Sequence, residues 1–423
     1  MTKKQQFHTK AHFYLTMLIA FLLPLAHYVP IIIILTVLNW LVEGDFRNKF
    51  HRIMSAKFAV LFCLFYILHL FGLIYTENMH SGSFDVQVKL SLIIFPLLYA
   101  SRPLKQEQLH SVFLALLSGA LLCSLLLIGN ATITYLSTGE NHFFYELFTA
   151  HVIHPSYLAM YINVIICWLL IQLQKNVAVF KRFSTAISLT LVLYFSFVLV
   201  LLSSKLGLLT LTFIYFSAFI YYSRKKYMIG IAGIVISCLI GWGIIRFVPA
   251  ITDRVKTATD AITSTTTNNA DAESTAVRML IWKAANEVFA EHFMFGTGPG
   301  DAKDELMKEY EKRGMTGALE HKLNAHNEFY QVFVALGFMG FLVFCIQLFF
   351  PFVVAIKEKN NIYAFFLIII ILNFLTEAML EAEAGVIFYA FFNSILCFSI
   401  YSKTQINSTH DPIFAATYRS ENN

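Results

Sequence analysis

The sequence predicts an all-α membrane protein that crosses a bilayer about twelve times. Of its 423 residues, 57% are hydrophobic and only 13% are charged, and the mean hydropathy is +0.64. A soluble domain is nearer a quarter charged. Apolar runs long enough to span a membrane recur along nearly the whole chain. One long polar stretch, residues 249–325, interrupts these runs and predicts a loop containing helices between spans nine and ten.

The apolar runs place the twelve spans in order along the chain. The first two are short for a hydrocarbon core of about 30 Å and can form one hairpin bent around Pro24 and Pro30. The predicted spans are residues 12–26, 29–43, 56–75, 86–101, 108–129, 152–173, 183–202, 205–222, 227–247, 328–350, 361–380 and 384–402.

The distribution of Lys and Arg predicts which side each loop faces. With the N-terminus inside the cell, most of the 31 Lys and Arg residues fall in inner segments, as the positive-inside rule expects. The short outer loops then contain only Lys89 and Lys205. Long loops are exempt from that rule, so residues 249–325 lie outside and both termini are cytoplasmic. Because topology accounts for the net charge of +5, we expect no nucleic-acid partner.

Cysteine usage and the N-terminus add two expectations. All six cysteines lie in apolar runs, and none has the spacing of metal ligands, so we expect small buried side chains rather than disulfides or a metal site. The basic N-terminal segment lacks a small-residue cleavage site, and it is interpreted as part of the first span rather than a signal peptide.

The long loop divides by composition. Residues 257–274 are polar, which is typical of a mobile segment. Residues 275–292 place apolar side chains on one helical face and predict an amphipathic helix that rests on the membrane domain or on lipid. FGTGPGD at 295–301 predicts a turn, and 302–313 predict a polar helix. The expected parts are nine transmembrane helices (1–248), the outer loop (249–325), three transmembrane helices (326–402) and a cytoplasmic tail (403–423).

His326 is the first candidate for chemistry because it stands at the head of the tenth span, which Asn324 or Asn327 is expected to cap. A helix N-terminus disfavours a protonated imidazole, so we expect His326 to stay neutral and able to accept a proton. The same backbone N–H groups can receive an anion. The alternative is an interfacial histidine that anchors the helix end.

Two cations are candidate ligands for an anion. Arg278 lies on the predicted amphipathic helix, where its guanidinium can grip a diphosphate or can simply face solvent and headgroups. Lys205 follows two serines in an outer turn and has no carboxylate neighbour in sequence, so it either binds an anion or extends to the membrane surface.

Four residues are supporting candidates, namely Asn327 beside His326 and the three that follow. Glu377 lies near the outer end of the eleventh span, where a buried acid suggests a role, although pairing with Lys205 or an outer Arg would also account for it. His154 precedes Pro155 at the start of the sixth span, where capping is the alternative. Gly298 belongs to GTGPGD, which lacks the Lys-Ser/Thr of a nucleotide-binding loop and favours a tight turn.

A divalent metal is not expected. No outer segment contains a DxD sequence, and the first outer loop has no carboxylate. Metal-dependent glycosyl transfer usually needs such acids. We therefore expect no cofactor, with cations stabilising any leaving phosphate directly.

These motifs together resemble the O-antigen ligase family, which includes O-antigen ligases, related polymerases and protein O-oligosaccharyltransferases. Arg278 is followed by Trp282 four residues on, then by FGTGPGD, then by His-Asn at the head of an apolar helix with LGFMGFLVF. HPSYLAMY, LLSSKLGLLTL and NFLTEAML extend the resemblance over most of the chain. Twelve spans with one long outer loop after the ninth agree with the family layout.

The resemblance implies a GT-C-type glycosyltransferase that works without a metal and inverts the anomeric centre. It would move a glycan from undecaprenyl diphosphate to a hydroxyl of lipid A-core, or of another glycan, at the periplasmic face of the bacterial inner membrane. His326 matches the family histidine proposed to activate the acceptor, and Arg278 matches an arginine thought to bind the diphosphate. Lys205 stands where the family usually has Arg, which keeps the charge but loses the bidentate fork.

Three other interpretations stay open. A polymerase of the same family would join repeat units that are both polyprenyl-linked. A transporter of lipid-linked sugar would place charged residues deep in several spans, whereas here polar residues gather at outer ends. A structural membrane protein would leave the outer cluster of Arg, Lys and His unexplained.

Overall fold

The computed structural model describes residues 3–26, 28–150, 152–175, 177–179, 184–223 and 275–409, and these contain helices and no strand. Before the long loop the helices are α1 (Lys3–Leu22), η1 (Leu23–Leu25), α2 (Val29–Glu43), α3 (Phe46–Ser55), α4 (Lys57–Gly72), α5 (Met79–Val88), α6 (Ser91–Ser101), α7 (Gln106–Thr138), α8 (Tyr145–Thr149), α9 (Pro155–Gln174), α10 (Ser184–Leu202) and α11 (Lys205–Ser223). After it come α14 (Thr275–Glu291), α15 (Ala302–Lys312), α16 (Thr316–Glu320), α17 (Glu328–Lys357), α18 (Asn361–Phe374), η2 (Met379–Glu381) and α19 (Glu383–Thr409).

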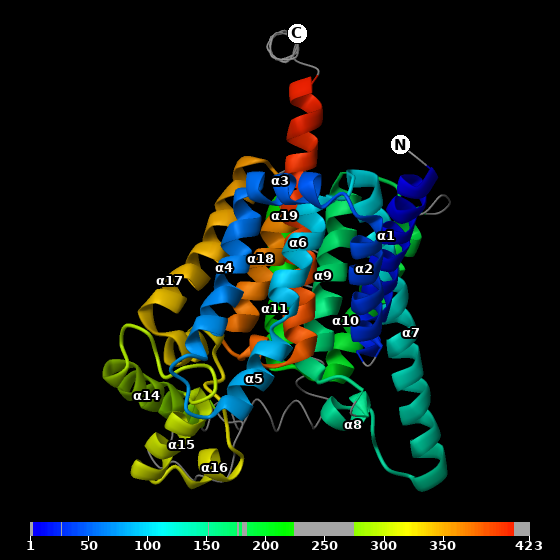
Figure 1. The fold of residues 1–423 in the computed structure, drawn as a ribbon. Helices are drawn as coiled ribbons and strands as arrows, with labels where there is room; N and C mark the ends of the chain where they lie inside the picture. Colours follow the sequence, from blue (N-terminus) through cyan, green and yellow to red (C-terminus); the bar gives the residue numbers. More distant parts are fainter. Residues whose placement is uncertain are drawn as a thin grey trace.

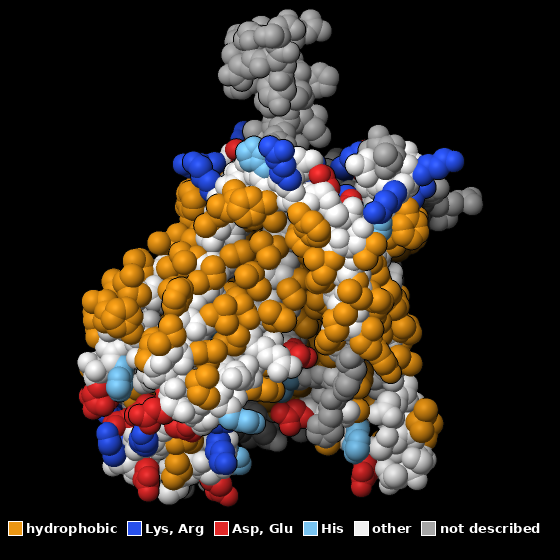
Figure 2. Space-filling view, viewed as in Figure 1, with side chains coloured by type: hydrophobic (Ala, Val, Ile, Leu, Met, Phe, Trp, Pro, Cys, Tyr) orange, Lys and Arg blue, Asp and Glu red, His pale blue; other side chains and the backbone are white. Residues whose placement is uncertain are grey.

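The long helices form a bundle with two unlike ends (Figure 1). The start of α1, α3 and the last turns of α19 lie at one end, and α5, α8, α14, α15 and α16 lie at the other. Hydrophobic side chains cover the middle of the visible face (Figure 2). Lys and Arg gather at the first end, whereas acidic, basic and His side chains are mixed at the second (Figure 2). The belt between two polar ends is the surface that a bilayer-spanning bundle needs.

Helix length and composition support the membrane class. Six described helical segments are long and apolar enough to span a bilayer, or seven if the sharply bent pair α2 and α3 forms one span. The six are Met79–Ser101 (α5 with α6), α7, α9, α10, α17 and Glu383–Ile400 of α19, while α4, α11 and α18 are shorter apolar helices. The polytopic helical class is therefore confirmed, and twelve spans stay a prediction. The predicted span 227–247 and the polar segment 257–274 lie outside the described residues.

Two helices form the centre of the bundle. α9 packs against α7, α10, α11 and α18, and α19 packs against α6, α7 and α18. Their apolar side chains point in all directions, as expected for helices surrounded by other helices. A close approach fixes one of these contacts, because a Cβ on Gly207 of α11 would lie 2.7 Å from the Cβ of Ala159 in α9. Asn163 then donates to the Gly207 carbonyl at 2.9 Å.

α17 is broken at Gly337, although the sequence predicted one continuous span over 328–350. Gly337 has φ +62° and ψ −161°, a backbone region essentially restricted to glycine. The turn after α14 fills the break, with N–H groups of Thr297 and Gly298 donating to the carbonyls of Val334 and Ala335, and those of Phe338 and Met339 donating to Phe293 and Met294. These four bonds replace the helical bonds that the break removes.

α14 confirms the predicted amphipathic helix and shows what its apolar face contacts. Val277, Ile281, Ala284 and Val288 are buried, and the helix packs on α15 and on the first part of α17. Aromatic pairs from α14 to α17 add to this contact, with Trp282 stacked on Tyr330 and Phe289 edge-on to Phe333. The face therefore rests on the protein, and α14 is held beside the start of α17.

Candidate functional site

A carboxylate links two of the predicted site residues at the end of the bundle where α14 lies. Oε1 of Glu377 is 3.3 Å from Nδ1 of His326, and Oε2 of the same side chain is 3.7 Å from Nη2 of Arg278. Glu377 lies in the loop after α18, His326 directly precedes the cap of α17, and Arg278 lies in α14. They are mostly buried, at 20%, 15% and 26% exposure respectively. Glu377 thus pairs with an outer arginine, one of the two pairings that the sequence left open.

Local hydrogen bonds fix the position of His326. Asn327 caps α17, because its Oδ1 accepts the N–H groups of Phe329 and Tyr330 at 2.9 and 3.3 Å. Asn324 does not cap the helix but accepts the N–H of His326 at 3.0 Å. His326 itself has φ +44°, a left-handed conformation that costs a non-glycine residue energy. Such strain persists only where the surroundings enforce it, and it commonly marks a functional position.

Arg278 is held in place by a hydrogen bond, but not all of its N–H donors have a partner among the described residues. Its Nη1 donates to the carbonyl of Thr376 at 2.8 Å, which ties α14 to the loop carrying Glu377. Its Nε is buried and has no hydrogen-bond partner among the described residues. A guanidinium has five N–H donors, so the backbone contact and the longer approach to Glu377 do not exhaust it. An anion at this place could accept the remaining bonds.

Glu377 is ionised in this setting. Burial by itself raises the pKa of Glu377, but the contact with the His326 imidazole and the positive charge of Arg278 outweigh burial and hold that pKa below its usual value. Nδ1 of His326 is buried and makes no hydrogen bond among the described residues, but the Glu377 carboxylate 3.3 Å away favours the tautomer with the proton on Nδ1, which leaves Nε2 to accept a proton. A carboxylate beside an imidazole in this way also occurs in the catalytic groups of hydrolases of unrelated folds.

His154 lies near this group and also caps its helix. It is the N-cap of α9, with Pro155 at the first helical position as predicted, and its Nδ1 accepts the N–H of Ser156 at 3.4 Å. Its exposed ring lies 3.8 Å from Oε1 of Glu146. His154 therefore caps α9 and also lies near Glu377.

Lys205 and Gly298 have different surroundings. Lys205 is exposed at the first residue of α11, which packs against α18, the helix that ends before Glu377. Gly298 has φ +95°, and a Cβ there would lie 2.3 Å from Oγ1 of Thr76. Its N–H is used by the carbonyl of Ala335 in α17. Diphosphate binding by Lys205 and a supporting role for Gly298 therefore stay predictions.

The FGTGPGD turn is tied to the loop between α4 and α5. Asp301 accepts the N–H groups of Glu77 and Asn78 at 2.7 and 2.8 Å, and Tyr75 donates to the Phe295 carbonyl at 2.7 Å. The close contacts of its glycines with neighbouring backbone explain why small residues are needed here. These contacts agree with the tight turn favoured by the sequence.

Sequence reasoning missed a buried charged cluster beside this site. Lys89 was assigned to a short outer loop, but it is 2% exposed within Met79–Ser101 and bonded to Asp85 and Glu381. The error has a physical cause, since Glu381 is 292 residues away along the chain and a burial partner so distant leaves no local pattern. Asp85, four residues before Lys89 on the same helical face, was the one local signal.

The fold and these residues define a polytopic helical membrane protein with a polar site at one end of the bundle. A family model described as O-antigen ligase matches residues 189–345, which include Lys205, Arg278 and His326. Over this range the chain is similar to O-antigen ligases, and the match supports the resemblance seen in the motifs. Enzymes of this family are glycosyltransferase-like and act on lipid-linked glycans. The chain matches no curated protein.

Proposed function

We propose that this protein transfers a glycan from undecaprenyl diphosphate to an acceptor hydroxyl at the periplasmic face of the bacterial inner membrane, as an O-antigen ligase does. The observation that carries the proposal is the Glu377 carboxylate lying between His326 and Arg278. It supplies a base, its orienting group and an anion-binding cation in one place, at the end of the bundle where a loop-borne helix covers the membrane domain.

His326 acts on the acceptor. Its Nε2 takes the proton of the acceptor hydroxyl while that oxygen attacks the anomeric carbon of the donor sugar. The bond from that carbon to the diphosphate oxygen breaks, and undecaprenyl diphosphate leaves with the electron pair. A single direct displacement inverts the anomeric centre. Glu377 holds the imidazole and stabilises the imidazolium that forms.

Arg278 acts on the leaving group. The charge that develops on the diphosphate is stabilised by fixed N–H donors in a site shielded from water. Lys205 adds a second positive charge from the start of α11, and no metal or other cofactor is required in this scheme. The acceptor is lipid A-core or another glycan, and the described part of the proposed periplasmic loop, residues 275–325, contributes Arg278 to the site.

The test compares surface glycolipids from a deletion strain carrying wild-type protein, His326→Ala or no protein. Glycans are resolved by size, and the polyprenyl-linked pool is measured in parallel. His321→Ala is the matched control, because His321 is an exposed histidine of the same loop. For a ligase, His326→Ala and the deletion both lose glycan from the lipid anchor and accumulate full-length polymer on the carrier, while His321→Ala behaves as wild type.

Other outcomes point elsewhere. Single repeat units left on the carrier, or one unit on the anchor, would identify a polymerase. A normal profile with His326→Ala but loss in the deletion strain would remove the catalytic base and favour a transporter of lipid-linked sugar. A normal profile in both strains would contradict transfer of this glycan.

A further inference from the structure

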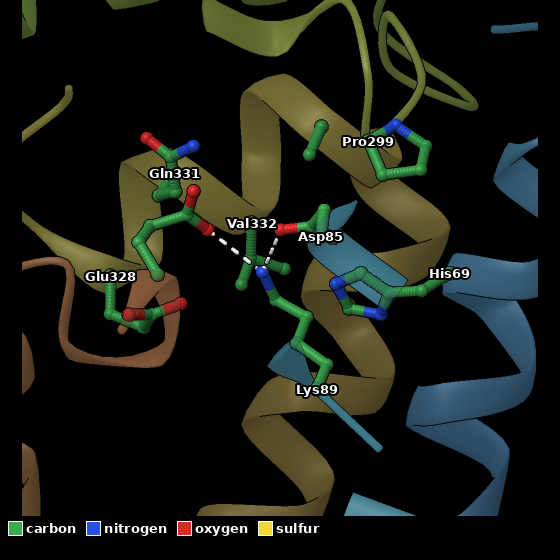
Figure 3. Close-up of a pocket in the computed structure, with 9 residues that line it drawn as sticks. His69, Asp85, Lys89, Pro299, Glu328, Gln331 and Val332 are labelled. Atoms are coloured by element: carbon green, nitrogen blue, oxygen red, sulfur yellow. Dashed lines mark hydrogen bonds and ion pairs between the residues drawn. The ribbon is translucent and has the colours of Figure 1, made fainter. Parts of the chain in front are cut away.

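A buried polar cluster contacts the loop that carries Glu377, through Glu328 and the N–H of Leu380. Figure 3 shows the side chains of this cluster. We name it the Lys89 cluster, and it consists of His69, Asp85, Lys89, Glu328 and Glu381. Lys89 points between two carboxylates, bonding Asp85 and, at 2.9 Å, Oε1 of Glu381 (Figure 3). A small cavity lies among these side chains and is also lined by Pro299 of the FGTGPGD turn.

The Lys89 cluster holds the loop that carries Glu377. That loop, residues 375–382, is gripped at one end by Asn327, which donates to the Leu375 carbonyl at 2.9 Å. At the other end Oε2 of Glu328 accepts the N–H of Leu380 at 2.7 Å, and Lys89 binds Glu381. Glu377 lies between these anchors, facing His326 and Arg278. The anchors are in the bundle, so they set the position of Glu377 without touching a substrate.

The charges of the cluster do not balance if every acid is ionised. Among the described members, one ammonium faces the carboxyl groups of Asp85, Glu381 and Glu328. His69 adds no cation, because its Nδ1 is bonded to the carbonyl of Phe65 in its own helix and its ring is buried. Uncompensated buried charge is costly. Because the Glu381 side chain is 29% exposed and can keep a hydrated charge, a proton on one further carboxyl group leaves Lys89 balanced by one buried carboxylate.

Glu328 is the acid best placed to hold it. Its side chain is 0% exposed, and no described Lys, Arg or His lies within ion-pair distance. Its Oε1 is buried without a hydrogen-bond partner among the described residues. Asp85 and Glu381 each contact Lys89 directly and are thereby compensated. A neutral Glu328 still accepts the Leu380 N–H through its carbonyl oxygen.

We propose that the Lys89 cluster positions residues 375–382 so that Glu377 faces His326, with Glu328 acting as a neutral carboxylic acid. The inference rests on the proposed function of His326 and Glu377. Glu328, Glu381 and Lys89 are positioning residues, since they act through the Glu377 loop.

The experiment measures glycan transfer against pH for purified protein with a polyprenyl-diphosphate-linked donor. Its variants are Glu328→Gln, Glu328→Leu, Glu381→Gln and, as the reference for a lost carboxylate, Glu377→Gln. Glu43→Gln is the matched control, because Glu43 is a buried acid that pairs with Lys49 and Arg102 at the opposite end of the bundle. Protein yield and melting temperature are recorded for each.

Glu328→Gln is expected to transfer within about twofold of wild type, since the amide reproduces the neutral acid. Glu328→Leu and Glu381→Gln are expected to lose roughly tenfold to a hundredfold in rate, the usual effect of removing an orienting contact. The loss is expected at every pH measured, and in kcat rather than in the KM for the donor, as in Glu377→Gln, because Arg278 stays in place to bind the diphosphate. Glu43→Gln lowers only the melting temperature.

Three results would overturn the proposal. A folded Glu381→Gln with the wild-type rate and pH profile removes the positioning role. Should Glu381→Gln fail to fold, a well-folded Glu328→Leu with a wild-type profile does the same. If Glu328→Gln loses as much transfer rate as Glu328→Leu, Glu328 does not act as a neutral acid. If the proposed function itself is wrong, His326→Ala retains transfer, and this result is distinct from the three above.

Discussion

Nδ1 of His326 and Oε1 of Glu377 lie 3.3 Å apart and join the start of α17 to the loop after α18. Glu377→Gln keeps the shape of the side chain but removes the charge that fixes the tautomer. We expect transfer to fall by at least about tenfold, because the imidazole loses its orienting acceptor. The measurement is the initial rate with purified protein. Glu320→Gln, an exposed acid on α16, should match wild type. Equal rates for both variants would refute the assignment.

The pH dependence of stability follows from the lowered pKa of Glu377. A carboxyl group whose folded pKa is depressed stabilises the protein fully above its unfolded pKa of about 4.3, and the contribution is lost as pH falls through the folded value. The melting temperature of wild type minus that of Glu377→Gln should therefore be positive and constant from pH 8 to about 5.5 and shrink below about 4. A difference that grows on acidification would contradict this sign.

Arg278→Lys tests the guanidinium as an anion ligand. Lysine keeps the charge but cannot both donate to the Thr376 carbonyl and present a planar fork. We expect the KM for the polyprenyl-diphosphate donor to rise about tenfold, with a smaller effect on the acceptor. Lys283→Ala removes an exposed cation from the same helix and should leave both KM values unchanged. An equal rise for donor and acceptor would argue against diphosphate binding at Arg278.

Trp282 holds the residue next to His326. Its indole Nε1 donates to the carbonyl of Ala325 at 3.0 Å. Trp282→Phe removes that bond while keeping an aromatic ring against Tyr330, so we expect a rate loss of roughly three- to tenfold from a bond worth about 1 kcal/mol. Trp40→Phe loses a comparable indole bond, to Ser101 at 2.8 Å, far from the site. A loss of rate in Trp40→Phe that equals that of Trp282→Phe would mean that general destabilisation is responsible.

Gly337 should not tolerate a side chain. Gly337→Ala would place a Cβ 2.4 Å from the backbone N of Gly296 in a conformation that disfavours alanine. We expect a destabilisation of order 1–3 kcal/mol or more, visible as a lower melting temperature and lower yield. Gly129→Ala in α7 has open space around it and should be neutral or slightly stabilising. A Gly337→Ala protein as stable as Gly129→Ala would contradict the observed break in α17.

Local patterns predicted the elements that are decided locally. The 3.6-residue spacing of apolar side chains in residues 275–292 predicted α14 to within one residue at its C-terminal end. Asn327 was one of two expected caps, and Pro155 was expected at the first position of its helix, and both are found there. Capping and periodicity depend on neighbours a few residues away, and therefore they can be read from a sequence.

Features set by distant contacts escaped prediction. The break at Gly337 depends on the opposing backbone of residues 293–298, and a glycine in an apolar run is ordinary in membrane helices. The burial of Lys89 depends on Glu381, and the contact of Glu377 with His326 depends on the packing of α17 beside α18. Arg278, His326 and Glu377 were each named from the sequence, but the pairings that bring these three together needed the three-dimensional arrangement, and their roles stay predictions.

The break in α17 also decides where this protein can be recombined with a relative. Val334, Ala335, Phe338 and Met339, on both sides of the break, exchange backbone hydrogen bonds with residues 293–298 after α14. The rest of α17 beyond Met339 packs as a membrane helix. A chimaera joined at the start of α17 would take residues 293–298 from one protein and residues 334–339 from the other. The four backbone hydrogen bonds between these segments would then have to form between mismatched sequences. A junction placed after Met339 keeps the four hydrogen bonds within one parent sequence. A chimaera should therefore take residues 293–339 from a single protein.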